Sequence, residues 1–434
     1  MKISNVLKRN QITLYLSIIV LFCVIYYVTC IFSQGNYVNA VFANDMNDTF
    51  MDYFNSIDNA KYDPYYDKYS NYPAMACIIY KILFKVVPIT QRDGNGFSLR
   101  NNQSAMVIFL VFNIISIWIA FTLISQRVKL KGISEKILIL AVCVSAPFMF
   151  TLERGNLIFF SFILSMFFVF NYGNENRVIK EISFLALALA AAIKIYPALF
   201  GFILLKRGNI KETIRLVIYG IVAFILPFFY YDGFNSLKIM LGALGYTSNI
   251  TEEIGYGVNL SLYNICKTFA SIFRVQILDW QIYVIYVIAI LGIILSFFIV
   301  QKRWLEELAI VLLMIFLPKT NYYYISIFLY IPFIDFINEW YENEDTFFAQ
   351  DRLSPICYFL MLVPWATKSI PMFSEVKMIV SYTMLLYYIL LLWFFVILIT
   401  EVIKKYIQNS REINLIIKAS LFVFSFNIFV TTFF

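Results

Sequence analysis

The 434-residue sequence contains no histidine. This removes the side chain that titrates near neutral pH and the commonest protein ligand for metal ions. Charged residues are also scarce, at 14% of the chain, whereas a soluble domain carries about 25%. The six cysteines lie mostly in apolar stretches and form no CxxC pair, which is typical of small buried hydrophobic side chains and not of a disulfide framework or a metal site.

Nucleotide-binding motifs are absent as well. The chain has no Walker motif and no GxGxxG, which disfavours an ATP-driven pump or a nucleotide-sugar enzyme of the cytoplasmic type. Hydrophobic residues make up 61% of the sequence, and the mean hydropathy is +0.76. Several apolar runs reach about 20 residues, the length that spans a bilayer. The sequence therefore predicts an all-α polytopic membrane protein with residues 1–434 in a single integral membrane domain.

Loop charges predict the orientation in the membrane. Basic residues cluster near 127–136, 177–180, 206–215, 302–303 and 404–405, and such clusters belong on the cytoplasmic side. The N-terminal run 11–32 is expected to be a retained signal anchor in the plasma membrane, with the N-terminus in the cytoplasm. The run 73–90 is expected to be re-entrant, because a full crossing would place the 127–136 cluster outside. The stretches 33–72 and 232–279 then become external loops.

Two long apolar runs are interrupted by proline. The run 182–205 is broken at Lys194-Ile195-Tyr196-Pro197, and the run 305–338 is broken at Pro318-Lys319-Thr320-Asn321. Proline disfavours a straight helix, and irregular backbone at membrane depth is tolerated where it lines a cavity or is buried in protein. We therefore expect half-helices whose polar breaks face a cavity that opens to the external side.

The first external loop is rich in aspartate. Its members are Asp45, Asp48, Asp52, Asp58, Asp63 and Asp67. The first three are spaced i, i+3, i+7, so a short helix would place them on one face. Asp48 and Asp52 lie in an amphipathic stretch expected at the membrane surface, and either would suit a general base. Paired aspartates also suit a divalent metal ion, and the sequence leaves this open while no other cofactor is predicted.

Three cationic residues accompany these carboxylates. Arg154 follows Glu153, with which it could pair, but its planar fork would equally bind a phosphate. Lys194 stands at a helix break, where it could snorkel to an interface or hold a lipid phosphate. Lys319 precedes Asn321 and three tyrosines that could form an aromatic belt, and Asn259 could belong to an ordinary helix cap.

These motifs together resemble glycosyltransferase family 87, the polyprenol-phosphate-mannose-dependent mannosyltransferase-like membrane proteins with the GT-C fold. The resemblance is strongest over 153–207, where Glu153-Arg154-Gly155-Asn156 and Lys194-Ile195-Tyr196-Pro197 occur in the family's order. The acidic loop ending in Tyr72-Pro73 and the segment Pro318 to Tyr324 extend it. The resemblance implies a GT-C-like bundle of about 11–13 transmembrane or re-entrant helices.

The resemblance also implies a function, in which a sugar such as mannose or another hexose passes from a polyprenyl-phosphate donor to a cell-envelope glycan or glycolipid with inversion. Asp52, or else Asp48, would be the general base, and Arg154, Lys194 and Lys319 would hold the donor phosphate. Further substrate contacts are expected from Tyr72, Asn156, Tyr196, Asn259, Asn321 and Tyr322. This chain departs from the family in lacking the histidine of the 319–324 segment. A polysaccharide polymerase or ligase, or a non-enzymatic transporter of lipid-linked glycans, remains an alternative.

Overall fold

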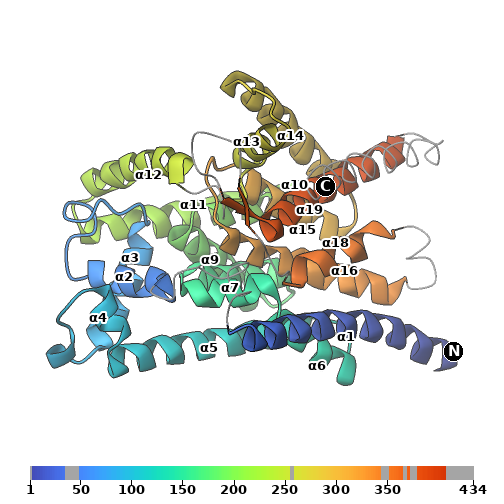
Figure 1. The fold of residues 1–434 in the computed structure, drawn as a ribbon, viewed down its shortest axis with the longest axis horizontal. Coiled ribbons are helices and arrows are strands. Elements are labelled where there is room, and N and C mark those ends of the chain that lie inside the picture. The colour runs from blue at the N-terminus through green and yellow to red at the C-terminus, as the bar shows by residue number, and fades with distance from the viewer. Residues whose placement is uncertain are drawn as a thin grey trace.

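The computed structural model describes residues 2–34, 48–254, 259–343, 351–364, 369–371 and 379–406. Most of these residues are helical (Figure 1). In the first half of the chain the elements are α1 Lys2–Phe32, α2 Met51–Asn59, α3 Ala74–Val86, η3 Ile89–Gln91, α4 Gly96–Arg100, α5 Gln103–Arg127, α6 Ile133–Cys143, α7 Ala146–Arg154, α8 Ile158–Asn171, α9 Arg177–Ile193, η4 Tyr196–Gly201 and α10 Phe202–Lys206.

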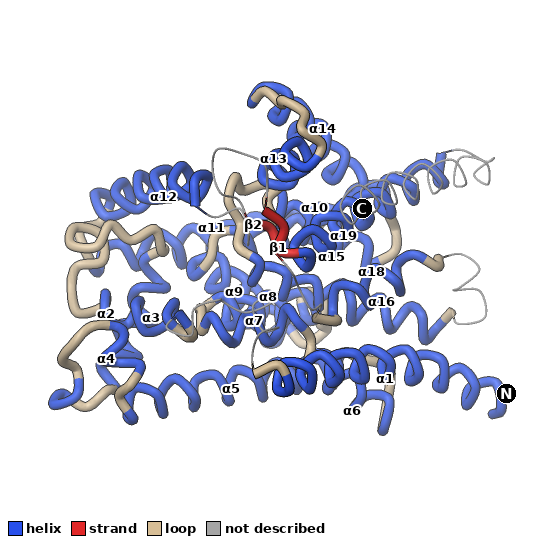
Figure 2. Tube along the Cα trace, in the orientation of Figure 1, coloured by secondary structure: helices blue, strands red, loops and turns tan. Residues whose placement is uncertain are grey.

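The second half begins with the long helix α11. Its elements are α11 Ile210–Ile225, η5 Leu226–Tyr230, α12 Phe234–Ile254, α13 Leu262–Ile272, α14 Asp279–Ile299, α15 Arg303–Phe316, η7 Tyr323–Leu329, α16 Tyr330–Glu342, α18 Leu353–Leu362, β1 Ser369–Pro371, β2 Ile379–Ser381 and α19 Tyr382–Tyr406. Figure 2 shows the strands as a small pair among the helices, and they are antiparallel with Ile370 opposite Val380. The predicted all-α polytopic class is confirmed.

Several helices are long and apolar enough to cross a membrane. Within the described ranges these are Gln11–Phe32, Gln103–Arg127, Ile210–Tyr230, Asp279–Ile299 and Met384–Lys405. The helices α6 and α7 would form one further span, bent by 50°. By contrast, the 13 residues of α3 cover about 20 Å, less than the ~30 Å of a bilayer core. This length agrees with the re-entrant interpretation of 73–90.

Helix α15 lies at the centre of the bundle. Every residue from Trp304 to Phe316 is buried, including Glu306 and Glu307. From Leu308 to Phe316 the helix is apolar on all sides, as expected of a fully buried helix. The helix contacts α14, α16, α19 and η4. The short α9–η4 and α15–η7 segments therefore pack in the interior, while α5, α11 and α14 present many exposed apolar side chains to the outside.

Both predicted helix breaks are present. Helix α9 ends at Ile193, and Lys194 has extended backbone dihedrals (φ −140°, ψ 126°) before η4 begins. Helix α15 ends at Phe316, and the amide of Asn321 donates a 2.8 Å hydrogen bond to the Met314 carbonyl that the ended helix leaves without a partner. Because each break is stabilised by contacts within the protein, irregular backbone is tolerated there.

The molecule has two distinguishable polar ends, separated by α5. At one end α4 contacts α2 and α5, and Arg100 donates a 3.2 Å hydrogen bond to the Thr49 carbonyl. The 25 residues of α5 then run about 37 Å to Arg127 at the other end. Figure 1 shows α2, α3 and α4 gathered at the left and the N-terminus at the right. We call these the α2 end and the Arg127 end.

Candidate active site

The first candidate carboxylates come together at the start of α2. The helix begins after Phe50, whose left-handed backbone (φ 63°) turns the chain sharply. Asp52 lies in the first helical turn, where a negative charge is favoured. Asp48 precedes the helix, so the expectation that Asp48 and Asp52 share a helical face is wrong, and Asp45 lies outside the described residues. The turn brings the two carboxylates together instead, with the Phe50 amide hydrogen-bonded to the Glu153 carbonyl at 2.7 Å.

Arg154 stands between these carboxylates. It is the last residue of α7, which ends because Gly155 adopts a left-handed conformation (φ 66°). A β-carbon at position 155 would come within 3.0 Å of the Phe109 ring, so glycine also permits this close approach. The two terminal nitrogens of Arg154 form ion pairs with Asp48 and Asp52, respectively. The Arg154 side chain is 16% exposed, and those of Asp48 and Asp52 are 46% and 20% exposed.

Asn156 connects Asp52 to a tyrosine. Its side-chain nitrogen lies 3.1 Å from Asp52 Oδ2 and 2.8 Å from the Tyr72 hydroxyl. Its side-chain oxygen accepts the backbone N–H of Ile158 at 3.0 Å. The amide is buried and its groups are engaged, so Asn156 orients the Asp52 carboxylate.

Lys194 approaches the same tyrosine over its ring. Its ammonium lies 4.3 Å from the centre of the Tyr72 ring and 5.7 Å from that of Tyr324, distances at which a cation is attracted by the ring face. Within the described ranges, no hydrogen bond or ion pair reaches this ammonium. The extended backbone at the break points the side chain toward the site, and the buried Tyr196 hydroxyl beyond the break also has no hydrogen-bond partner among the described residues.

Two tyrosines of the second helix break complete the surroundings. The rings of Tyr322 and Tyr324 lie 5.7 Å apart, and both hydroxyls interact electrostatically with Asp52 and Arg154. Tyr322 belonged to the predicted set, whereas Tyr324 did not. Tyr324 lies in the first turn of η7, which begins directly after the extended residue Tyr322, and no signal in the sequence singled it out from Tyr323.

We call the residues gathered here the aspartate cluster. Its members are Asp48, Asp52, Tyr72, Arg154, Asn156 and Lys194. The cluster joins segments that lie up to about 146 positions apart in the sequence, from residue 48 to residue 194. The two carboxylates are charge-balanced by Arg154, and Lys194 adds a cation.

Other candidate residues have contacts elsewhere. The Asn321 backbone N–H donates to the Asn259 side chain at 2.9 Å, and the Leu260 backbone N–H donates to the Asn321 carbonyl at 2.7 Å. These bonds tie the second break to the segment before α13, which gives Asn259 and Asn321 structural roles. Lys319 lies 5.1 Å from the Tyr263 ring centre and interacts with Asp279.

The remaining aspartates of the first loop shape the loop itself. Asp58 pairs with Lys61 at 2.8 Å. Asp63 accepts the backbone N–H of Tyr65 at 2.8 Å, and Asp67 accepts the backbone N–H of Asp63 at 2.9 Å. Such local bonds are typical of aspartate in turns, so these carboxylates are engaged with their own loop.

A divalent metal does not fit the aspartate cluster as arranged. The described residues contain no group of three or more histidine, cysteine, aspartate or glutamate side chains that could hold a metal ion. Asp48 and Asp52 both face the Arg154 guanidinium, which a bridging ion would have to displace.

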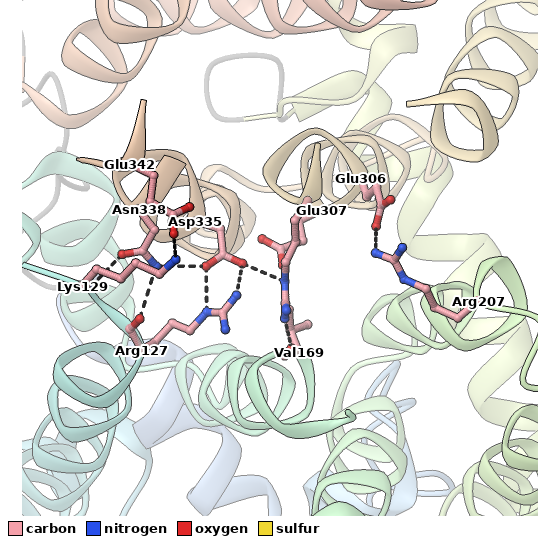
Figure 3. Close-up of polar contacts among 10 residues, drawn as sticks. Arg127, Lys129, Val169, Arg207, Glu306, Glu307, Asp335, Asn338 and Glu342 are labelled. Carbon is pink, nitrogen blue, oxygen red and sulfur yellow. Dashed lines mark hydrogen bonds and ion pairs between the residues drawn. The ribbon is translucent and has the colours of Figure 1, made fainter. Parts of the chain in front are cut away.

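The Arg127 end has a polar cluster of its own, part of which is shown in Figure 3. We call it the ion-pair cluster, and its members are Arg127, Arg303, Glu306, Glu307, Asp335, Asn338, Lys206 and Arg207. The Asp335 carboxylate accepts two hydrogen bonds from the Arg127 guanidinium, at 2.7 and 2.6 Å. It also forms an ion pair with Arg303 at 2.8 Å. The carboxylates of Asp335, Glu306 and Glu307 are between 1% and 4% exposed, and each contacts at least one cation.

Comparison with known proteins identifies the family of this architecture. The sequence model of glycosyltransferase family 87 matches residues 97–318. The matched region begins at α4 and ends just before Lys319, so it includes Arg154, Asn156 and Lys194. No curated protein and no solved structure matches the chain.

Proposed function

The chain belongs to glycosyltransferase family 87 and is a membrane glycosyltransferase, and from this premise we propose that its donor is a hexose, such as mannose, on a polyprenyl phosphate. The acceptor would be a glycan or glycolipid of the cell envelope. The reaction would occur at the α2 end, on the external face of the plasma membrane. This orientation is supported by the basic residues at the Arg127 end, which belong on the cytoplasmic side.

One observation carries the proposal: the Asp52 carboxylate and the Lys194 ammonium, which has no ion-pair partner in the described part of the chain, flank the same tyrosine. Asn156 bridges Asp52 and the Tyr72 hydroxyl, while the Lys194 ammonium lies over the Tyr72 ring. A transfer from a lipid phosphate needs a base on the acceptor side and a positive charge on the leaving-group side. The aspartate cluster supplies both within the reach of one side chain.

The chemistry follows from this placement. Asp52 takes the proton of the acceptor hydroxyl as its oxygen forms a bond to the anomeric carbon. The bond between that carbon and the phosphate oxygen breaks, and the lipid phosphate leaves with the electron pair. Lys194 stabilises the charge that develops on the phosphate. Attack opposite to the leaving group inverts the anomeric centre.

Arg154 has a double role in this proposal. Its guanidinium holds Asp48 and Asp52 in position. Its planar fork could also donate hydrogen bonds to a phosphate oxygen on the side that faces Asp48, the more exposed of the two carboxylates. The resemblance places Tyr322 or Tyr323 where other family members carry a histidine. The hydroxyls of Tyr322 and Tyr324 are suited to hydrogen-bond sugar or phosphate oxygens. Lys319 remains a further candidate for the phosphate.

The direct test is a donor panel. Purified protein in lipid nanodiscs is incubated with polyprenyl-phosphate mannose, polyprenyl-phosphate glucose and the corresponding nucleotide sugars, with an envelope lipid extract as acceptor. We expect sugar transfer or release from a lipid-phosphate donor and none from the nucleotide sugars. Transfer from nucleotide sugars alone would contradict the proposal.

The same panel distinguishes a hexosyltransferase from a polymerase or ligase. A hexosyltransferase adds one sugar per acceptor per turnover, which mass spectrometry detects as a single hexose increment. A polymerase or ligase instead transfers a preassembled glycan. The Asp52→Asn protein is the control, because any activity that persists in it comes from a contaminant or from another base.

A further inference from the structure

An apolar groove runs beside the aspartate cluster. Its volume is about 520 Å³, and it lies between α9, the η4–α10 segment and α11. Thr213 supplies the polar side chain in its lining, and that hydroxyl already donates to the Asn209 carbonyl at 3.0 Å. A polar ligand would find no partner here, whereas a hydrocarbon chain would.

Small residues create the space. Ala188, Ala191 and Ala198 line the groove together with Gly201 and Gly220. A β-carbon at Gly201 would approach Leu216 to 3.3 Å, whereas a β-carbon at Gly220 would meet no atom within 4 Å. The groove is therefore tight where η4 packs on α11 and open beside Gly220.

The groove opens toward the surrounding lipid. Helix α11 is part of the candidate span Ile210–Tyr230, of which 17% is buried within the protein. Val217 and Ile221 line the groove and are 53% and 58% exposed. Exposed apolar side chains on a spanning helix face lipid chains, so a chain can enter from the side.

One end of the groove lies beside the helix break that carries Lys194. Leu187 and Ala191 lie one helical turn apart on α9, and Ile195, which also lines the groove, directly follows Lys194. At the break the chain thus presents Ile195 to the groove and the Lys194 ammonium to Tyr72 and the aspartate cluster. A ligand with a charged head at Lys194 and a hydrocarbon tail would find both parts of its site adjacent.

We infer that this groove binds the phosphate-proximal part of the donor's isoprenoid chain. The inference rests on the proposed function, since it takes the phosphate at Lys194 as its anchor. A hydrocarbon tail gains little by leaving lipid for an equally apolar groove. The groove therefore orients the tail, and with it the phosphate and the anomeric carbon, more than it adds affinity.

Gly220→Leu tests this inference, because the new side chain enters the open part of the groove. Leucine also favours helix relative to glycine, so the variant should fold. Gly242→Leu is the matched control: Gly242 lies in α12, has equally open space at its β-carbon and does not line the groove. With a long-chain polyprenyl-phosphate sugar, we expect kcat/KM to fall about tenfold or more in Gly220→Leu and to stay unchanged in Gly242→Leu.

A short-chain prenyl-phosphate sugar distinguishes an effect of the variant on the donor tail from an effect on the reaction centre. Its kcat/KM should change little in Gly220→Leu, because its chain ends before the blocked region. Equal losses of kcat/KM for the long and short donors, or no loss for either, would overturn the assignment of the donor chain to this groove. The proposed function would stand. A wild-type protein that uses no lipid-phosphate donor would overturn the proposed function, and this inference with it.

Photocrosslinking identifies the occupant directly, even if Gly220→Leu fails to fold. A long-chain prenyl phosphate with a photoreactive group near the phosphate should label peptides from α9 and α11 in wild-type protein. Unlabelled prenyl phosphate in excess should abolish this labelling. Equal competition by a phospholipid would show that the groove holds an ordinary bilayer lipid, and labelling of other segments would place the donor chain elsewhere.

Discussion

The two polar clusters contain the same kinds of side chain, but these side chains differ in how completely they are paired and buried. In the ion-pair cluster, Asp335 contacts two arginines and is 4% exposed. In the aspartate cluster, Asp48 is 46% exposed, and no ion pair reaches the Lys194 ammonium from the described residues. In the ion-pair cluster every carboxylate has a cationic partner, although Glu307 Oε2 accepts no hydrogen bond from the described residues. In the aspartate cluster it is a cation, Lys194, that has no ion-pair partner among those residues.

This difference separates stability from function. A buried ion pair has little net effect on folding when intact, but it is costly to break, because the remaining partner becomes a buried unpaired charge. The ion-pair cluster joins α5, α15 and α16 in this way. The Lys194 ammonium lies over ring faces, and such contacts leave its N–H groups available to a ligand. The comparison predicts that substitutions at the α2 end affect turnover and those at the Arg127 end affect folding.

The largest effect is expected from Asp52→Asn. Removing a general base typically lowers kcat by about 10²–10⁴-fold, while the amide keeps the size of the side chain and one acceptor for Asn156. The measurement is sugar transfer by purified protein, together with its thermal unfolding temperature. Asp58→Asn is the matched control, because Asp58 belongs to the same loop but pairs with Lys61. Near-normal activity in both Asp52→Asn and Asp48→Asn would refute a base from this loop.

Asp335→Ala should have its effect on stability. It removes the carboxylate that Arg127 and Arg303 share. Breaking a buried ion pair in this way typically lowers the free energy of unfolding by about 3–5 kcal/mol. We expect a markedly lower unfolding temperature in detergent, with nearly normal turnover per folded molecule at low temperature. Loss of turnover in protein that is still fully folded would remove the distinction between the two clusters.

Lys194→Ala should weaken donor binding. Losing a hydrogen bond to a charged group costs about 1.5–3 kcal/mol, or roughly 10–100-fold in affinity. The affinity for polyprenyl phosphate can be measured by competition with the donor. Lys81→Ala is the matched control, since Lys81 also lies over tyrosine rings, those of Tyr230 and Tyr231. Unchanged affinity in Lys194→Ala would mean that Lys194 does not bind the phosphate and that its ammonium only snorkels to an interface.

The smallest effect is expected from Lys129→Ala. Lys129 pairs with Glu342 at the edge of the ion-pair cluster, and both side chains are about half exposed, at 47% and 53%. Such surface pairs contribute about 0–1 kcal/mol. We expect neither unfolding temperature nor turnover to change measurably. A large loss of stability would mean that Lys129 and Glu342 also belong to the ion-pair cluster.

Local patterns in the sequence predicted much of the architecture. Apolar runs indicated membrane helices, and the Pro197 and Pro318 segments indicated breaks that the structure places at Lys194 and after Phe316. These features depend on hydrophobicity and backbone sterics within a few residues. The expected helical face for Asp48 and Asp52 was wrong, because spacing does not reveal where a helix begins, and the left-handed turn at Phe50 starts it too late.

The sequence by itself determined that the chain is a helical membrane protein with aspartates, cations and two broken helices, since composition and short-range sterics decide such properties. Only the tertiary structure decided which charges meet. It placed Arg154 between Asp48 and Asp52, left Lys194 over Tyr72, and added Tyr324 to the site. These pairings join segments far apart in the chain, and they follow from the packing of α2, α7 and α9, which no local pattern encodes.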